Sequence, residues 1–288
     1  SIFNILRKMN SGYVIRNAEI SEISIFLNYA RKEGWNPGVK DGIAFWEADN
    51  QGFIIGFLDN NPIATISCVK YDDSFSFLGF YIVKNEYRNL GYGIKIWNKA
   101  LEYAGNTNTG LDGVLAQQKN YERAGFKLAY NNIRYEGINK IVSVSEKTVN
   151  YNDKLFDEIN EFDNKHFLSD RKSFLKAWFN NAKAVKVKMH GSKVKGYGVI
   201  RQCFSGYKIG PVFSDDEFSA EEVITDLLKS IPGGEKYYLD VPSVNQSAVN
   251  ICEKRCMKKV FETVRMYNQY IPEIPINNVF GITTFELG

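Results

Sequence analysis

A short pattern recurs in the chain at a distance of 131 residues, and this repeat limits the possible folds more than any other feature. Residues 121–127, YERAGFK, align with residues 252–258, CEKRCMK, and the same offset places Ile133-Arg134 over Val264-Arg265. The order of strand and helix signals around the two segments also agrees. Two copies of one supersecondary plan are therefore predicted, with a turn shared by chance at two helix-to-strand junctions as the alternative.

The first half alternates helix and strand signals. Apolar residues at three- and four-residue spacing predict a helix over 19–32, and a shorter helical stretch follows at 43–49. Three strand candidates come next, at 52–58, 62–71 and 75–83, with turn residues between the first two. Because strands joined by short turns pair antiparallel, this part of the chain predicts an antiparallel meander.

The second half repeats this order after a polar stretch at 145–151, where the strand pattern gives way to turn residues and a new helix. We place the domain boundary there and divide the chain into residues 1–145 and 146–288. The predicted fold is α+β, a mixed α/β class, with two tandem domains that each hold a mostly antiparallel central sheet flanked by helices.

Composition and charge exclude several classes of protein. The 288 residues are 44% hydrophobic with a net charge of +3, and the basic residues are scattered, so no nucleic-acid partner is expected. No run of about 18 apolar residues predicts a membrane span, and the stretch 1–13 lacks the apolar core of a signal peptide. The four cysteines form no Cys-x-x-Cys pair and only two histidines are present, so no metal is predicted. We expect a folded cytoplasmic protein.

The segment 86–93, EYRNLGYG, lies between a strand candidate and an amphipathic helix pattern. The first N–H groups of a helix lack intrahelical partners and carry a partial positive charge, which favours a bound anion. Glycine permits positive φ and leaves room for a phosphate, and Arg88 adds a cation. A Gly-x-Gly between a strand and a helix is also an ordinary turn, so the loop by itself leaves both interpretations open.

The order of meander, R-x-x-G-x-G at 88–93, amphipathic helix and NYERAGF at 120–126 resembles the GNAT (Gcn5-related N-acetyltransferase) superfamily. The whole chain resembles two-domain GNAT proteins with a degenerate GNAT-like C-terminal half. The resemblance implies an acyltransferase with acetyl-CoA (coenzyme A) as co-substrate, which transfers acetyl to a primary amine of a small molecule or peptide by direct attack on the thioester. No Gly-Lys-Ser/Thr follows the loop, which separates it from a P-loop.

In this superfamily the strand before the loop diverges from its neighbour and leaves backbone groups free for the pantetheine arm. The resemblance implies that Trp35 and Asn36 form one wall of the acceptor pocket, with a hydrophobic plug and an ordinary turn as the competing interpretation. It also implies a set of donor-binding residues: Tyr81, Ile82, Val83, Arg88, Asn89, Leu90, Gly91, Tyr92, Gly93 and Asn120.

Amine attack on a thioester needs a neutral amine, a polarised carbonyl and a proton for the departing thiolate. Tyr121 matches the superfamily position whose phenol faces the sulfur, and we predict it as the general acid, with packing beneath a short helix as the alternative. A lysine-like amine with a reference pKa of about 10.4 arrives protonated, so a base is needed. Asp41 and Glu47 are the candidates, although each is also an ordinary surface carboxylate.

The second half lacks these features at the corresponding positions. Where the loop would be, residues 211–222 read PVFSDDEFSAEE, without Gly-x-Gly and with five carboxylates that repel a pyrophosphate. Cys252 stands where the first half has Tyr121, and a buried structural role is favoured for this cysteine over that of a nucleophile. We predict one CoA site, in the first half, while the second half covers the acceptor site or mediates a homodimer.

Two other functions stay open at this point. The first is a non-catalytic CoA-binding or sensing module, which thioester consumption in the presence of amines would separate from an enzyme. The second is an aminoacyl-tRNA-dependent transferase, which needs a basic groove that the scattered charge does not suggest.

Overall fold

The computed structural model describes residues 12–140 and 145–288. The stretch 1–13, for which the sequence predicts no signal peptide, therefore lies almost entirely outside the described residues. The first half contains strands β1 (Tyr13–Asn17), β2 (Phe53–Leu58), β3 (Asn61–Lys70), β4 (Phe75–Val83), β5 (Asn108–Val114) and β6 (Lys127–Ile138), and helices α2 (Ile23–Lys32), α3 (Asp41–Ala48), α4 (Tyr92–Ala104) and α5 (Gln118–Arg123). The second half contains strands β7 (Val149–Asn150), β8 (Ala184–His190), β9 (Lys193–Gln202), β10 (Tyr207–Ser214), β11 (Lys236–Pro242), β12 (Lys258–Tyr267) and β13 (Val279–Gly281), and helices α6 (Phe156–Asn164), α7 (Lys172–Asn180), α8 (Glu217–Leu228) and α9 (Gln246–Lys254).

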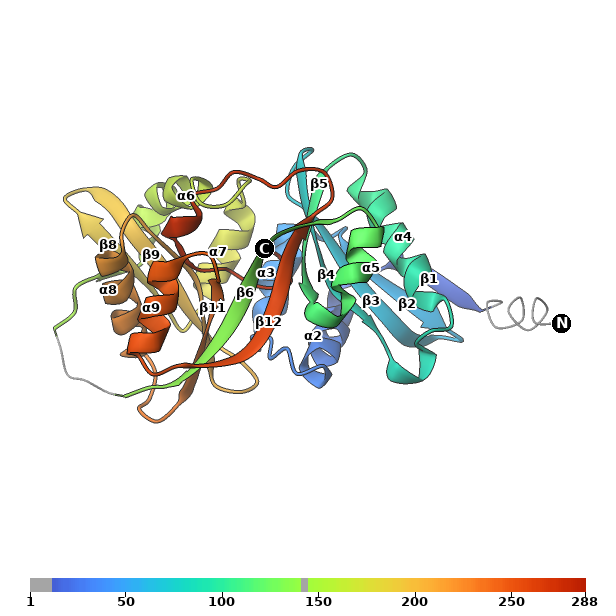
Figure 1. Ribbon diagram of the computed structural model, residues 1–288, viewed down its shortest axis with the longest axis horizontal. Coiled ribbons are helices and arrows are strands. Elements are labelled where there is room, and N and C mark those ends of the chain that lie inside the picture. Colours follow the sequence, from blue (N-terminus) through green and yellow to red (C-terminus); the bar gives the residue numbers. More distant parts are fainter. Residues whose placement is uncertain (1–11, 141–144) are drawn as a thin grey trace.

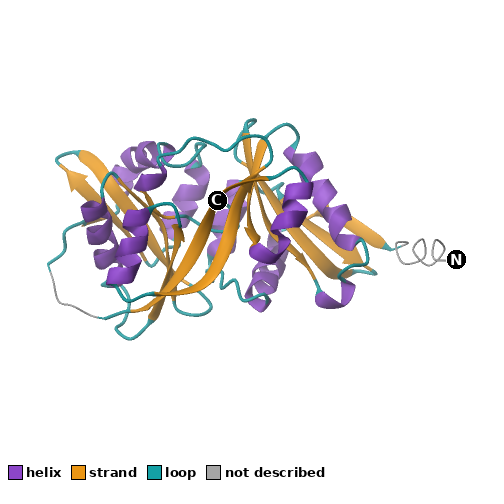
Figure 2. Ribbon diagram, in the orientation of Figure 1, coloured by secondary structure: helices purple, strands orange, loops and turns teal. Residues whose placement is uncertain are grey.

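All 13 strands of the described residues belong to one sheet, in which neighbours run β1-β2-β3-β4-β5-β12-β6-β11-β10-β9-β8-β7, with β13 beside β10. Only β4 with β5 and β10 with β11 pair in parallel, so the sheet is mostly antiparallel as predicted. The order contains an exchange, because β12 of the second half pairs with β5 and β6 of the first half pairs with β11. The long strands β6 and β12 lie side by side between the halves (Figures 1 and 2) and join the two predicted sheets into one.

The register of β6 and β12 has approximate twofold symmetry. Asn132 lies opposite Thr263, and these two residues are equivalent at the 131-residue offset. Asn131 pairs with Val264, and Ile133 pairs with Glu262, as a twofold axis through the first pair requires. The repeat predicted from the sequence is therefore confirmed as a structural repeat.

Two buried ion pairs lie at equivalent positions on either side of this axis. Arg134 of β6 donates to both carboxylate oxygens of Asp240 on β11, at 2.7 and 2.9 Å. Arg265 of β12 donates to both oxygens of Asp112 on β5, at 2.7 and 2.6 Å. Each pair joins one half to the other, so ion pairs as well as backbone hydrogen bonds hold the exchanged strands in place. The division of the chain into domains 1–145 and 146–288 stays a prediction, because each half contributes a strand to the sheet of the other.

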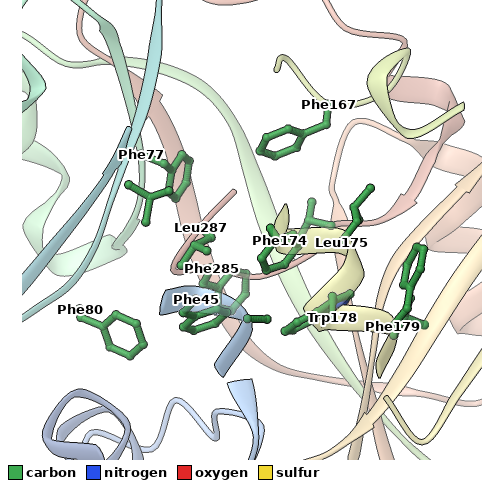
Figure 3. Close-up of a cluster of buried hydrophobic side chains, with 14 of the residues drawn as sticks. Phe45, Phe77, Phe80, Phe167, Phe174, Leu175, Trp178, Phe179, Phe285 and Leu287 are labelled. Atoms are coloured by element: carbon green, nitrogen blue, oxygen red, sulfur yellow. The ribbon is translucent and has the colours of Figure 1, made fainter. Parts of the chain in front are cut away.

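An aromatic cluster fills the space between the halves (Figure 3). Phe45 of α3 contacts Phe80 of β4, with 5.7 Å between ring centroids, and stacks on Trp178 of α7 at 6.1 Å. Phe285 and Leu287 belong to the same cluster and lie in residues 279–288, here called the C-terminal tail. The tail is thus part of the core between the halves.

Candidate active site

A cavity of about 590 Å³ opens between β4 and β5. These two strands pair only from Phe75 to Leu78 of β4 and then diverge, so the later residues of β4 face the cavity in place of a neighbouring strand. The divergence predicted from the resemblance is present. The lining residues are Glu33, Trp35, Leu78, Gly79, Phe80, Tyr81, Ile82, Val83, Tyr87, Arg88, Asn89, Gly91, Gly93, Ile94, Trp97, Leu111, Asp112, Val114, Gln117, Tyr121, Phe261, Thr263, Phe285 and Glu286.

A β-bulge in β4 marks the point where the strands separate. Phe80 and Tyr81 together lie opposite the single residue Ile66 of β3. Phe80 has a φ of 50°, and its carbonyl accepts a hydrogen bond from Thr65 Oγ1 at 2.7 Å. A bulge interrupts the hydrogen-bond ladder and turns the strand, so it presents backbone groups to the cavity at this point.

The glycine loop closes one end of the cavity. Gly91 is the N-cap of α4, with a φ of 89°, and no side chain caps this helix. A Cβ at Gly93 would lie 2.8 Å from the hydroxyl of Tyr81, which also lines the cavity. The two glycines therefore serve different purposes, because Gly91 provides a left-handed conformation and Gly93 provides space.

Arg88 lies at the rim of the cavity in a fixed position. Its Nε donates to the carbonyl of Val83 at 2.7 Å, and a second guanidinium nitrogen donates to Glu33 at 2.6 Å. Arg88 therefore lies beside the glycine loop, as predicted. Its partner Glu33, which was not predicted, offsets part of the positive charge.

Tyr121 of α5 lies at the cavity, as predicted. Its ring stacks on Trp97 of α4 at 5.7 Å, and it packs so closely over Gly113 that a Cβ there would overlap the ring. Burial, with a smaller contribution from Tyr81, raises the pKa of Tyr121 to about 12. The phenol is therefore protonated at neutral pH, as a proton donor must be.

Three predicted donor-binding residues are not among those that line the cavity. Leu90 is exposed, and the ring of Tyr92 is buried against Tyr13 at 4.8 Å. Asn120 donates to Gln117 at 2.6 Å, and Gln117 lines the cavity in its place. The assignments of Leu90, Tyr92 and Asn120 to the donor site stay predictions.

The candidate bases Asp41 and Glu47 are not brought to the cavity. Asp41 is 3% exposed, accepts from Arg201 of β9 at 2.8 Å and from the backbone N–H of Gly38 at 2.9 Å, and so holds α3 to the second half. Glu47 is exposed on α3 and is not among the lining residues. An acceptor seated in the cavity would therefore not meet either carboxylate in this arrangement.

The predicted acceptor residues Trp35 and Asn36 have different positions. Trp35 lines the cavity, and its carbonyl accepts from Arg134 at 2.7 Å. Asn36 instead binds the second half, because its side chain exchanges hydrogen bonds with the backbone of Ser205 at 2.8 and 2.9 Å and its carbonyl accepts from Lys208 at 2.8 Å. The turn at 35–38 is thus mainly a contact between the halves.

The second half contributes four cavity residues that the sequence analysis missed. Phe261 and Thr263 come from β12, and Phe285 and Glu286 come from the C-terminal tail. The first two reach the cavity because β12 pairs with β5, a pairing that the 131-residue offset does not predict. No pattern in the sequence pointed to the tail.

The second half has the same divergence of strands but fills it with its own chain. β10 pairs with β11 only over three residues and carries a bulge in which Gly210 and Pro211 lie opposite Val199. Beyond the bulge, Val212 and Phe213 pair with β13 of the C-terminal tail. The opening that faces solvent in the first half is therefore occupied by a strand in the second.

The start of α8 is also occupied. Its N-cap Asp216 accepts from the backbone N–H of Ser219 at 2.8 Å, whereas α4 has no side-chain cap. Cys252 is buried, and burial raises the pKa of its thiol to about 12, which agrees with a structural role. In the described residues, no His, Cys, Asp or Glu side chains form a group of three or more that could hold a metal ion, and no helix has the length and apolar character to cross a membrane.

Comparison with known proteins gives matches to both halves. Residues 20–126 match the model of the acetyltransferase (GNAT) family, and residues 159–281 match the model of an acetyltransferase (GNAT) domain. A holothin acyltransferase from Pseudoalteromonas sp. (strain SANK 73390) is 29% identical over 285 residues, which cover 98% of this chain and 97% of the relative.

Solved structures share the fold over nearly the whole chain. A protein from Pyrococcus horikoshii, described among the acetyltransferases, superposes with a TM-score of 0.83 at 22% identity and covers 96% of each chain. A tandem GNAT protein from the clavulanic acid biosynthesis pathway superposes with a TM-score of 0.64 at 9% identity, over 91% of this chain and 99% of that one.

The two family matches and the relative identify a two-domain acyltransferase with a GNAT domain in each half. The chain belongs to the GNAT (Gcn5-related N-acetyltransferase) family, whose members generally use acetyl-CoA, and it is an enzyme of acyl transfer. A purely non-catalytic CoA-sensing role is thereby set aside.

Proposed function

We propose that the protein transfers an acetyl group from acetyl-CoA to a primary amine of a small molecule by direct attack of the amine on the thioester. The observation that carries the proposal is that one cavity has both the uncapped glycine loop at one end and the protonated Tyr121 in its wall. The holothin acyltransferase, similar over nearly its full length, supports a small acceptor over a peptide.

The residues present fit a CoA donor. Residues 79–83 offer an unpaired strand edge for an extended pantetheine arm, which main-chain hydrogen bonds would hold as an added strand. The start of α4 has no side-chain cap and follows the left-handed residues Asn89 and Gly91, and a helix start of this kind suits a pyrophosphate. When bound, acetyl-CoA supplies the activated acyl group.

Two features of the first half would then serve the reaction. The backbone N–H groups of the bulge at Phe80 and Tyr81, two residues that line the cavity, would stabilise the negative charge that develops on the thioester carbonyl. The hydroxyl of Tyr121 would donate its proton to the departing sulfur. Its pKa of about 12 keeps it protonated, although it makes full transfer to a thiolate with a reference pKa of about 8.5 uphill unless the sulfur is also desolvated.

The donor site is tested by Gly91→Asp, with Gly234→Asp as the matched control. Both positions have similar φ, 89° and 84°, and open space beside them, so the backbone strain is comparable. A carboxylate beside a bound phosphate costs about 4 kcal/mol, roughly a thousandfold in Kd. Calorimetry should show loss of CoA binding in Gly91→Asp alone; equal affinity in both variants would remove the phosphate site from the loop.

The acceptor is tested by transfer assays with acetyl-CoA and a panel of small primary amines, with holothin, the compound in the relative's name, assayed beside them. Thiol release that depends on a small amine is expected. If every amine is inactive while a peptide panel releases thiol, the small-molecule part of the proposal is wrong.

A further inference from the structure

Glu286 differs from the other carboxylates of the cavity because none of the cationic side chains that the structure describes lies at hydrogen-bond distance from it. Glu33 is paired with Arg88, and Asp112 is held by both guanidinium nitrogens of Arg265. Glu286 is 3% exposed and lines the cavity, and its Oε1 has no hydrogen-bond partner among the described residues. Burial of a carboxylate without such a partner lowers the stability of the folded state, and a functional role for Glu286 would explain why the protein keeps it there.

The position of Glu286 along the cavity is defined by Gly79. The backbone of Glu286 packs directly on Gly79, so closely that a Cβ there would overlap the carbonyl of Glu286. Gly79 immediately precedes the bulge at Phe80 and Tyr81. Glu286 thus lies where β4 and β5 separate, at the end of the cavity where the thioester is expected, and away from the glycine loop.

The C-terminal tail holds Glu286 in this position. β13 pairs with β10, the carbonyl of Leu287 accepts from Tyr71 at 2.7 Å, and Arg171 donates to Thr283 Oγ1 at 3.0 Å. The flanking residues Phe285 and Leu287 are packed in the core between the halves (Figure 3). The strand that fills the opening of the second half therefore also positions a carboxylate in the cavity of the first.

Charged groups of both halves surround Glu286. Burial raises the pKa of Glu286 above its ordinary value; Lys208 of β10, Arg134 of β6 and Arg201 of β9 oppose the rise, and Asp41 of α3 adds to it. Arg134 is held by Asp240, and Lys208 donates to the carbonyl of Asn36. Arg201 donates to Asp41 through Nε, while its two terminal nitrogens have no hydrogen-bond partner among the described residues. Since none of these groups is hydrogen-bonded to Glu286 Oε1, this oxygen can accept a proton.

We propose that Glu286, supplied by the C-terminal tail of the second half, is the general base that accepts the proton lost by the acceptor amine. The proposal rests on the proposed acetyl transfer. The amine nitrogen forms the N–C bond to the acetyl carbonyl carbon, and the C–S bond breaks. Glu286 takes one proton from the nitrogen, Tyr121 gives one to the sulfur, and solvent returns both residues to their starting states.

The test compares Glu286→Gln with the native protein, using acetyl-CoA and the best acceptor of the amine panel between pH 5 and 9. At pH 8 we expect kcat/KM for the amine to fall by about 10²- to 10⁴-fold, with the Kd for CoA within about twofold of native. The ratio of native to variant kcat/KM cancels the titration of the amine itself. This ratio should decline toward one as the pH falls through the raised pKa of Glu286.

A ratio that stays near one, or that is large but independent of pH, overturns the proposal. Glu161→Gln, which changes an exposed carboxylate of α6 outside the cavity, is the control and should keep the native profile. If Glu286→Gln does not fold, Glu286→Asp decides: it should lose at least about tenfold in kcat while binding CoA normally, and native turnover in this variant overturns the proposal. Failure of acetyl transfer itself would appear as an inactive native protein and is thus distinguishable.

Discussion

At the scale of single residues, the two glycines of the loop illustrate how one pattern has two physical causes. Gly91 adopts a φ of 89° with open space beside it, whereas Gly93 stands against the hydroxyl of Tyr81. Gly91→Ala should lower the free energy of unfolding by about 1–2 kcal/mol, because a side chain is strained in this conformation. Gly93→Ala should change it by less than about 1 kcal/mol, since a ring hydroxyl can shift and alanine favours the helix. Urea denaturation measures both, and equal losses would contradict the distinction.

Tyr121→Phe tests the proposed general acid. We expect kcat to fall by about 10²-fold or more with the Kd for CoA nearly unchanged, because only the hydroxyl is removed. The acid acts in its protonated form, and its pKa is about 12, so no loss of native activity from this group is expected up to about pH 10. An unchanged kcat in the variant would leave Tyr121 with a packing role alone.

Tyr121, Arg88 and the glycines could be predicted because they lie in two short motifs, R-x-x-G-x-G and NYERAGF, that resemble the superfamily. Glu286 was not predicted, and it reaches the cavity from the far end of the sequence through packing on Gly79. The two predicted bases, Asp41 and Glu47, both lie in the first half, and Asp41 is bound by Arg201 of β9, which is also distant in sequence.

At the scale of elements, the starts of α4 and α8 are equivalent in position and opposite in character. Asp216 caps α8 by accepting from Ser219 N–H, while α4 starts at Gly91 without a side-chain cap. Asp216→Ala should cost about 1 kcal/mol in unfolding free energy. The neighbouring Asp215, in an exposed pair with Lys195, is the control, and its replacement by Ala should cost less than about 0.5 kcal/mol. Equal costs would show that Asp216 does not act as a cap.

Helix α4 also shows what periodicity determines and what it leaves open. Three- and four-residue spacing predicts an apolar stripe through Ile94, Trp97, Leu101 and Ala104, and of these Trp97 and Ala104 are buried. Ile94 is 56% exposed and lines the cavity, and the buried face includes Ile96 and Ala100 instead. The spacing of apolar residues predicts the helix, but it does not show that Ile94 faces the cavity and not the core.

At the scale of the whole molecule, the exchange of β6 and β12 makes the two halves one structure. The 131-residue repeat predicted two copies of one plan, but the same strands could have paired within each half, so the exchange was not predictable from sequence. What distinguishes the two pairings is contact between distant residues, including the ion pairs of Arg134 with Asp240 and Arg265 with Asp112.

Asp240→Ala should therefore destabilise the whole chain. Removal of one partner leaves Arg134 buried with an uncompensated charge, which costs about 3–5 kcal/mol. Unfolding should remain a single transition, because each half contains a strand of the other. Glu102→Ala, which breaks an exposed pair with Lys99, is the control with a change below about 0.5 kcal/mol. Two separate transitions in the native protein would show that the exchange does not couple the halves.

The most direct test of the central claim is a crystal structure of the chain with CoA. Our account predicts one CoA per chain, with pantetheine along residues 79–83 of β4, the pyrophosphate at the start of α4, and β13 still paired with β10. A CoA molecule seated beside β10 in place of β13, or bound outside the cavity between β4 and β5, would contradict the account.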